Sequence, residues 1–113
     1  MIFQLENKNI HASDSGQGID TNKDTIVFLH GSGLSHIVWS LAEQFFSSKN
    51  YNVLSIDLPG HGNSDGPCIN TIEKITDWLE KAFIQLNLNE GLNFYKLFCD
   101  NYLSKFVLCY LKV

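Results

Sequence analysis

The sequence has few cysteines, no basic cluster and no long apolar run. Each of these absences argues against one class of protein. The longest uncharged apolar run near the C-terminus, residues 106–111, has six residues, whereas about 20 are needed to span a bilayer. The N-terminus lacks the basic segment and apolar stretch of a signal peptide. The three cysteines, Cys68, Cys99 and Cys109, have no metal-ligand spacing, which is typical of reduced thiols. We therefore expect a cytoplasmic protein with no membrane span.

Charge and composition are those of a globular protein. Charged residues make up 18 % of the 113 residues and hydrophobic residues 44 %, which excludes a disordered chain. Because the formal net charge is −4, we expect no binding to nucleic acid. A chain of this length forms at most one domain and is short for a doubly wound enzyme.

The hydrophobic pattern predicts a hairpin followed by two buried strands. Residues 2–6 and 9–13 alternate loosely around a short polar turn, which indicates a β-hairpin. Residues 25–29 are apolar on both faces, as expected of a parallel strand that helices cover on each side. Residues 51–56 are predicted to form a second buried strand.

Two amphipathic helices are predicted between and after these strands. In the first, over residues 35–48, apolar residues recur at intervals of three and four: Ile37, Val38, Leu41, Ala42, Phe45 and Phe46. The second begins after a cap at Asn70 or Thr71 and ends at residues 87–91. Its apolar stripe is Ile72, Ile75, Leu79, Phe83 and Leu86. The order predicts an α/β fold, an N-terminal hairpin plus a parallel β-α-β-α unit with a right-handed crossover.

Both buried strands end abruptly at a glycine-rich turn. The first turn reads His30-Gly31-Ser32-Gly33, and the second runs from Asp57 through Leu-Pro-Gly60-His61-Gly62-Asn to Ser64. Glycine lets backbone N–H groups face a ligand with no side chain in the way. Ligands of parallel sheets bind beyond the carboxyl ends of the strands, where both turns lie.

These two motifs, with one helix between them that carries Trp39, resemble the α/β-hydrolase superfamily over roughly residues 10–90. The resemblance implies the N-terminal part of an α/β-hydrolase fold. It also implies that a full-length relative hydrolyses an ester-like bond of a small molecule by means of a serine nucleophile and an oxyanion hole, without a cofactor or a metal.

The resemblance further implies roles for the two turns. His30, Gly31, Ser32 and Gly33 would form the oxyanion-hole loop, with the backbone N–H of Ser32 as a donor. Losing one such donor raises a barrier by about 3 kcal/mol. The alternative for the glycines is an ordinary strand-to-helix turn. The second turn would form a structural loop in which Asp57 accepts backbone N–H groups and His61, like His30, organises the loop. The structural-loop residues are Asp57, Pro59, Gly60, His61, Gly62 and Ser64.

A complete catalytic set is not expected in this chain. Residues 62–66 match Gly-x-Ser-x-Gly, but a nucleophile elbow needs a strand running into the first glycine and a helix starting at the serine. Pro59 precedes the motif and Pro67 follows it, so we reject Ser64 as the nucleophile. No glycine flanks Cys99, and no histidine follows His61. Without nucleophile, acid and base, an oxyanion hole gives little chemistry, and we expect no activity.

Residues 92–113 differ in character from residues 1–91, which form the hydrolase-like part. This tail holds six of the twelve Phe and Tyr residues and no glycine or proline. It fits a shortened or frame-shifted reading frame, and residues 105–111 suit a strand as well as a helix. If no fifth strand forms, the strand at residues 25–29 keeps an open apolar edge through which the chain would self-associate.

Three other interpretations remain. A dinucleotide-binding unit would use the glycine turn and Asp57, but His36 stands where the third glycine is needed. A metal site of His30, His36, His61 and Asp57 fits no known ligand spacing. The third is a non-enzymatic fragment or interaction protein, in which the fold persists and nothing is hydrolysed.

Overall fold

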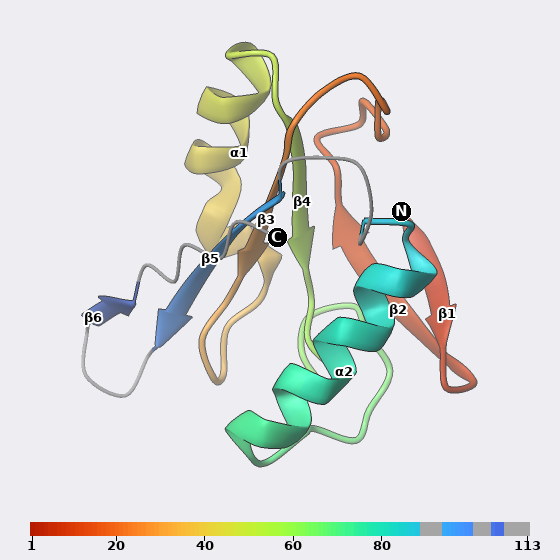
Figure 1. The fold of residues 1–113 in the computed structure, drawn as a ribbon. Helices are drawn as coiled ribbons and strands as arrows, with labels where there is room; N and C mark the ends of the chain where they lie inside the picture. Colours follow the sequence, from red (N-terminus) through yellow and green to blue (C-terminus); the bar gives the residue numbers. More distant parts are fainter. Residues whose placement is uncertain (89–93, 101–104, 108–113) are drawn as a thin grey trace.

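The structure is a computed structural model that describes residues 1–88, 94–100 and 105–107. Its described strands form one mixed sheet with the order β1-β2-β4-β3-β5-β6, and two α-helices pack against this sheet (Figure 1). The strands are β1 (Ile2–Leu5), β2 (Lys8–Ser13), β3 (Thr25–Leu29), β4 (Asn52–Ile56), β5 (Phe94–Asp100) and β6 (Lys105–Val107). The helices are the 3-10 helix η1 (His36–Trp39) and the α-helices α1 (Ser40–Ser48) and α2 (Ile72–Gln85).

The predicted N-terminal hairpin is confirmed, but its turn lies at residues 6–7, one position before the predicted turn at residues 7–8. Strands β1 and β2 pair antiparallel from Ile2↔His11 to Leu5↔Lys8. The two residues between them, Glu6 and Asn7, have φ angles of 53° and 62°. Positive φ at both central residues is the backbone that suits the twist of a two-residue hairpin.

The predicted parallel unit is also confirmed. Strands β3 and β4 lie side by side and pair in parallel from Thr25↔Asn52 to Leu29↔Ile56. All five residues of each strand are buried, as expected of parallel strands that helices cover on both faces. The carboxyl ends of β3 and β4 therefore lie next to each other.

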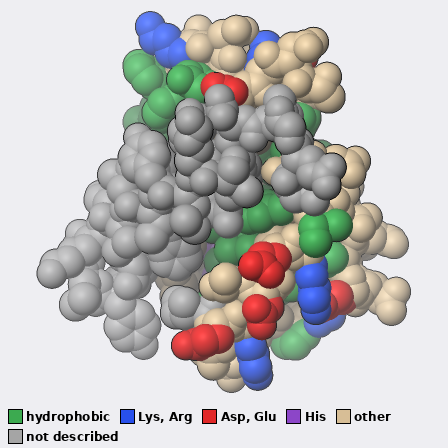
Figure 2. Space-filling model, viewed as in Figure 1, with side chains coloured by type: hydrophobic (Ala, Val, Ile, Leu, Met, Phe, Trp, Pro, Cys, Tyr) green, Lys and Arg blue, Asp and Glu red, His purple; other side chains and the backbone are tan. Residues whose placement is uncertain are grey.

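Helix α2 covers one face of the sheet, with Leu79 and Phe83 of the predicted stripe buried and Trp78 and Ala82, outside that stripe, buried beside them. Thr71 caps it, because its side chain accepts a hydrogen bond from the backbone N–H of Lys74 at 3.2 Å. Buried residues of the helix pack against alternate residues of β3 and β4: Trp78, Leu79, Ala82 and Phe83 against Val27, Leu29, Leu54 and Ile56. The outer side of α2 is charged, and Figure 2 shows the mixed acidic and lysine side chains on this face.

Helix α1 covers the other face, but with a different set of residues from the predicted stripe. Trp39, Ala42 and Phe46 pack against Ile26, Phe28 and Val53. Ile37, Val38, Leu41 and Phe45 are exposed, Leu41 by 82 %. The segment starts as a 3-10 turn, whose three-residue period changes which residues face the sheet. The pattern contained two apolar rows, and only the row that includes Trp39 packs against the sheet, where its residues are partly buried.

A fifth strand does form in the structure, so β3 does not keep the open edge that we expected in its absence. Strand β5 pairs with β3 in parallel from Thr25↔Phe94 to Leu29↔Phe98, and β6 pairs antiparallel with β5. Pairing with a further strand satisfies the backbone groups of an exposed edge, and residues 94–100 provide this strand. Of residues 105–111, residues 105–107 form β6, and residues 108–111 lie outside the described residues.

Candidate functional site

The two glycine-rich turns lie next to each other at the carboxyl ends of β3 and β4. His30, the first residue after β3, is fully buried and joins them. Its Nε2 accepts a hydrogen bond from the backbone N–H of Leu58 at 3.0 Å, and its Nδ1 lies 2.8 Å from the carbonyl oxygen of Gly31. Nδ1 therefore carries the proton and donates to Gly31. The imidazole connects one turn to the other.

The ring of His30 is held in its neutral form. Burial lowers its pKa, the hydrogen bond to Gly31 opposes this, and the neighbouring His61 lowers the pKa further. The His61 ring packs against the His30 ring with the centroids 5.0 Å apart. A neutral ring suits the role of Nε2 as an acceptor. A proton carrier in this position would have to break the contact with Leu58.

The turn after β3 has the backbone of a tight loop. The N–H of Leu34 donates to the carbonyl of Gly31 at 3.1 Å, and Gly33 has a φ of 77°. A side chain rarely adopts this φ, which explains the second glycine. Among the described residues, no atom lies within 4 Å of the position that a Cβ at Gly33 would take.

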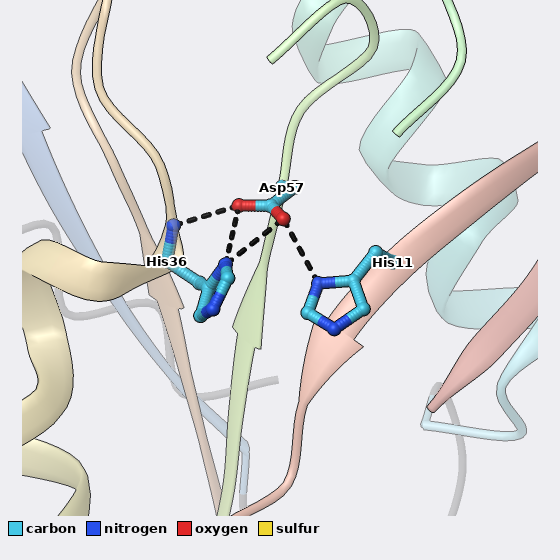
Figure 3. A group of neighbouring side chains, drawn as sticks. All are labelled: His11, His36 and Asp57. Atoms are coloured by element: carbon cyan, nitrogen blue, oxygen red, sulfur yellow. Dashed lines mark hydrogen bonds and ion pairs between the residues drawn. The ribbon is translucent and has the colours of Figure 1, made fainter. Parts of the chain in front are cut away.

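Asp57, the first residue after β4, is a fully buried carboxylate. Oδ1 accepts a hydrogen bond from the backbone N–H of His36 at 2.7 Å, and Oδ2 accepts one from the backbone N–H of Asn63 at 3.1 Å. The Nδ1 atoms of His11 and His36 each lie 2.9 Å from Oδ2 (Figure 3). One carboxylate thus connects β2, η1 and the loop after β4.

The charge of Asp57 follows from these contacts. Burial by itself raises its pKa, but hydrogen bonds from the backbone N–H groups of His36 and Asn63 and from the imidazoles of His36 and His11 lower the pKa more. Asp57 is therefore an anion at neutral pH. With both oxygens bonded inside the protein, it does not reach a ribose, which disfavours the dinucleotide interpretation.

Ser64 is bonded to the backbone on both sides. Its Oγ accepts a hydrogen bond from the N–H of His11 at 2.9 Å and donates one to the carbonyl oxygen of Asp57 at 2.6 Å. A nucleophilic serine needs its hydroxyl aimed at a base and at the substrate. These bonds instead join the loop after β4 to β2.

The metal set considered from the sequence does not form. The structure brings His36 and Asp57 together. By contrast, both ring nitrogens of His30 bond to backbone groups, and Nδ1 of His61 lies 3.1 Å from the carbonyl of Pro59. The residue that completes the cluster is His11, and the ligand atoms of His11, His36 and Asp57 lie within 4.8 Å of one another.

Sequence reasoning missed His11. It stands between Ile10 and Ala12, which are buried, so alternation places it on the opposite face of β2. Its backbone carbonyl accepts from the N–H of Asp57 at 2.9 Å, because β2 pairs with β4. A prediction that the hairpin pairs with β4 would have placed His11 next to Asp57.

The comparisons with known proteins agree with this architecture. Residues 26–92 match the family described as the alpha/beta hydrolase family, which is more than half of the chain. The chain therefore belongs to the alpha/beta hydrolase family. The match includes both glycine-rich turns, all of strand β3 but its first residue, strand β4, and helices α1 and α2.

Individual relatives match over a similar region. The chain is 31 % identical over 83 residues to (E)-2-((N-methylformamido)methylene)succinate hydrolase of Acinetobacter baylyi, with 73 % of this chain and 29 % of the relative covered. It is 38 % identical over 66 residues to 2-succinyl-6-hydroxy-2,4-cyclohexadiene-1-carboxylate synthase of Escherichia coli, with 58 % and 25 % covered. The chain thus spans less than a third of the length of these relatives.

A solved structure shows the same arrangement. The haloalkane dehalogenase DatA of Agrobacterium tumefaciens C58 is 27 % identical and superimposes with a TM-score of 0.71, covering 88 % of this chain and 32 % of the dehalogenase. A membrane phospholipase A, 19 % identical with a TM-score of 0.71, shares the fold.

Neither described α-helix is long and apolar enough to cross a membrane.

Proposed function

We propose that this chain provides the oxyanion side of an alpha/beta-hydrolase site, with the turn after β3 as the anion-binding loop and the backbone N–H of Ser32 as its donor. The observation that carries this proposal is the position of the turn. It follows a buried parallel strand, it contains a left-handed glycine at Gly33, and His30 fixes it to the neighbouring turn. Such fixed donors stabilise the negative oxygen of a tetrahedral intermediate.

The chain by itself hydrolyses no ester in this proposal. The hydroxyl of Ser64 is engaged with backbone groups, and Cys99 lies inside β5, paired with Phe106 of β6, rather than at a strand-to-helix turn. No histidine follows His61 in the sequence. These residues fit a longer protein in which further parts supply the nucleophile and the base. They fit equally a protein that has no nucleophile and no base.

The relatives indicate what a whole domain of this kind acts on. The names of the Acinetobacter and Escherichia coli relatives both refer to carboxylates. We therefore propose a small carboxylated molecule with an ester-like bond as the substrate class, and a cytoplasmic location in keeping with the cysteine pattern. The alternative, a non-enzymatic interaction protein, has the same fold and shares the prediction of no turnover.

An ester-hydrolysis assay tests the lack of activity. Purified chain and the Ser64→Ala variant are incubated with p-nitrophenyl acetate, and the release of nitrophenol is followed against buffer alone. We expect the same rate of nitrophenol release with both proteins, and no enzymatic turnover by either. Multiple turnovers by the unmodified chain that Ser64→Ala abolishes would make Ser64 a nucleophile and overturn the proposal.

A further inference from the structure

The cluster of His11, His36 and Asp57 has a donor set that the hydrolase chemistry above does not use. The three side chains come from different parts of the fold: β2, the start of η1, and the residue after β4. They converge in Figure 3, with both imidazoles on the same carboxylate. Two imidazole nitrogens and one carboxylate oxygen form the ligand set of many open zinc and iron(II) sites.

We propose that His11, His36 and Asp57 bind a divalent transition-metal ion, with Zn²⁺ as the best-fitting candidate. The proposal does not depend on the proposed hydrolase role, because none of the three residues belongs to the turn after β3. Their ligand atoms already lie within 4.8 Å of one another. Donors that share a tetrahedral ion at about 2.0–2.2 Å stand roughly 3.3–3.5 Å apart.

The movement required is small. Each Nδ1 now lies 2.9 Å from Oδ2 of Asp57, so each imidazole has to move away from Oδ2 by roughly 0.5 Å to reach the spacing of two ligands of one ion. The ligand atoms of the two imidazoles, which lie within 4.8 Å of each other, have to reach the same spacing. The Nδ1–H···Oδ2 bonds are then replaced by Nδ1–metal bonds. A neutral ring keeps its proton by carrying it on Nε2, and a protonated ring releases one proton to solvent. No oxidant or reductant is involved.

Access and charge favour a cation at this position. The side chains of His11 and His36 are 20 % and 19 % exposed, whereas that of Asp57 is fully buried. An ion can therefore approach from the imidazole side and meet a fixed negative charge behind. Three protein ligands leave a coordination position for water.

The surrounding structure holds the ligands in place. The backbone N–H groups of His36 and Asn63 orient the carboxylate of Asp57, and Ser64 Oγ accepts from the N–H of His11. Outer hydrogen bonds of this kind orient metal ligands. Gly62 leaves room for the carboxylate of Asp57, because a Cβ at this position would collide with it.

The test uses the tag-free full chain after treatment with EDTA and exhaustive dialysis. Co²⁺ is titrated in and followed by visible absorption, and Zn²⁺ affinity is measured by competition with a chromophoric chelator. The chain is compared with His11→Gln and His36→Gln. His61→Gln is the matched control, because it also removes one imidazole but lies outside the cluster. Circular dichroism establishes that each variant is folded.

We expect one equivalent of metal to bind to the unmodified chain and to His61→Gln, and at least about tenfold weaker binding in His11→Gln and His36→Gln. Absence of stoichiometric binding to the unmodified chain overturns the proposal, and so does equal binding by all four proteins. If a variant does not fold, imidazole NMR of the unmodified chain decides. Zn²⁺ should then shift the ring signals of His11 and His36 and leave those of His61 in place, and the opposite pattern refutes the site.

Discussion

The Nε2 atom of His30 accepts a hydrogen bond from the backbone N–H of Leu58, and this bond links the turn after β3 to the turn after β4. The two residues are 28 positions apart in sequence, but the parallel pairing of the strands brings them together. A buried imidazole thus holds the proposed anion-binding loop against the rest of the sheet.

Replacing His30 should destabilise the chain strongly. His30→Ala leaves the N–H of Leu58 and the carbonyl of Gly31 without this partner and creates a cavity, so we expect a loss of about 2–4 kcal/mol in the free energy of unfolding. Urea denaturation at pH 7.5 measures it. His61→Ala removes the half-buried neighbouring ring and should cost less than about 1 kcal/mol. Equal losses in the two variants would contradict a linking role for His30.

The lowered pKa of His30 predicts a dependence of stability on pH. The folded state keeps His30 neutral, whereas the unfolded state takes up a proton below the ordinary value of 6.5. Stability is therefore highest above this value and falls as the pH drops through it towards the lower pKa of the folded state. Denaturation curves between pH 8 and pH 5 should show a decline that is shallower in His30→Ala. An identical slope in the two proteins would refute this assignment.

Asp57 gives a second pH-dependent contribution with its window at lower pH. Its pKa in the folded state lies below the ordinary value of 3.8, so its stabilising effect is present above 3.8 and disappears as the pH falls through the folded-state pKa. Asp57→Asn should therefore be less stable than the unmodified chain at pH 6, with the difference narrowing towards strong acid. Thermal melts across this range measure the difference. A gap that stays constant with pH would exclude a contribution from the carboxylate charge.

Gly62 is a glycine at which a side chain should be strongly destabilising. It has a φ of 50°, and an added Cβ would collide with the carboxylate of Asp57. Gly18 has a φ of 71° but open space around it. Gly18→Ala should cost about 1 kcal/mol from backbone strain alone, and Gly62→Ala clearly more, as measured by urea denaturation. Similar losses would show that the loop adjusts freely around Asp57.

Local sequence patterns predicted the elements whose signals are local. The runs at residues 25–29 and 51–56 form β3 and β4, and Thr71 caps α2. The buried face of α1 was not predictable, because two apolar rows compete and only packing against Phe28 selects the row of Trp39. The pairing of β5 with β3 was not predictable either, because the two strands are far apart in sequence. An apolar run indicates a buried strand but not the strand with which it pairs.

The site was also predictable only where its signals are local in sequence. The motifs place His30 and Asp57 at adjacent strand ends, and the structure has both there. His11 was missed because its contact with Asp57 joins residues 46 positions apart and depends on β2 pairing with β4. The role of Ser32 as an anion donor stays a prediction.

The most direct measurement of the central proposal is an NMR titration of the ¹⁵N-labelled chain with a small alkyl phosphonate, an anion that resembles a tetrahedral intermediate. If the turn after β3 binds anions through its backbone, the amide signal of Ser32 should shift most, and Ser32→Ala, which keeps the N–H, should respond in the same way. An unchanged Ser32 amide, with shifts confined to lysine-bearing surfaces such as that around Lys74 and Lys81, would contradict the account.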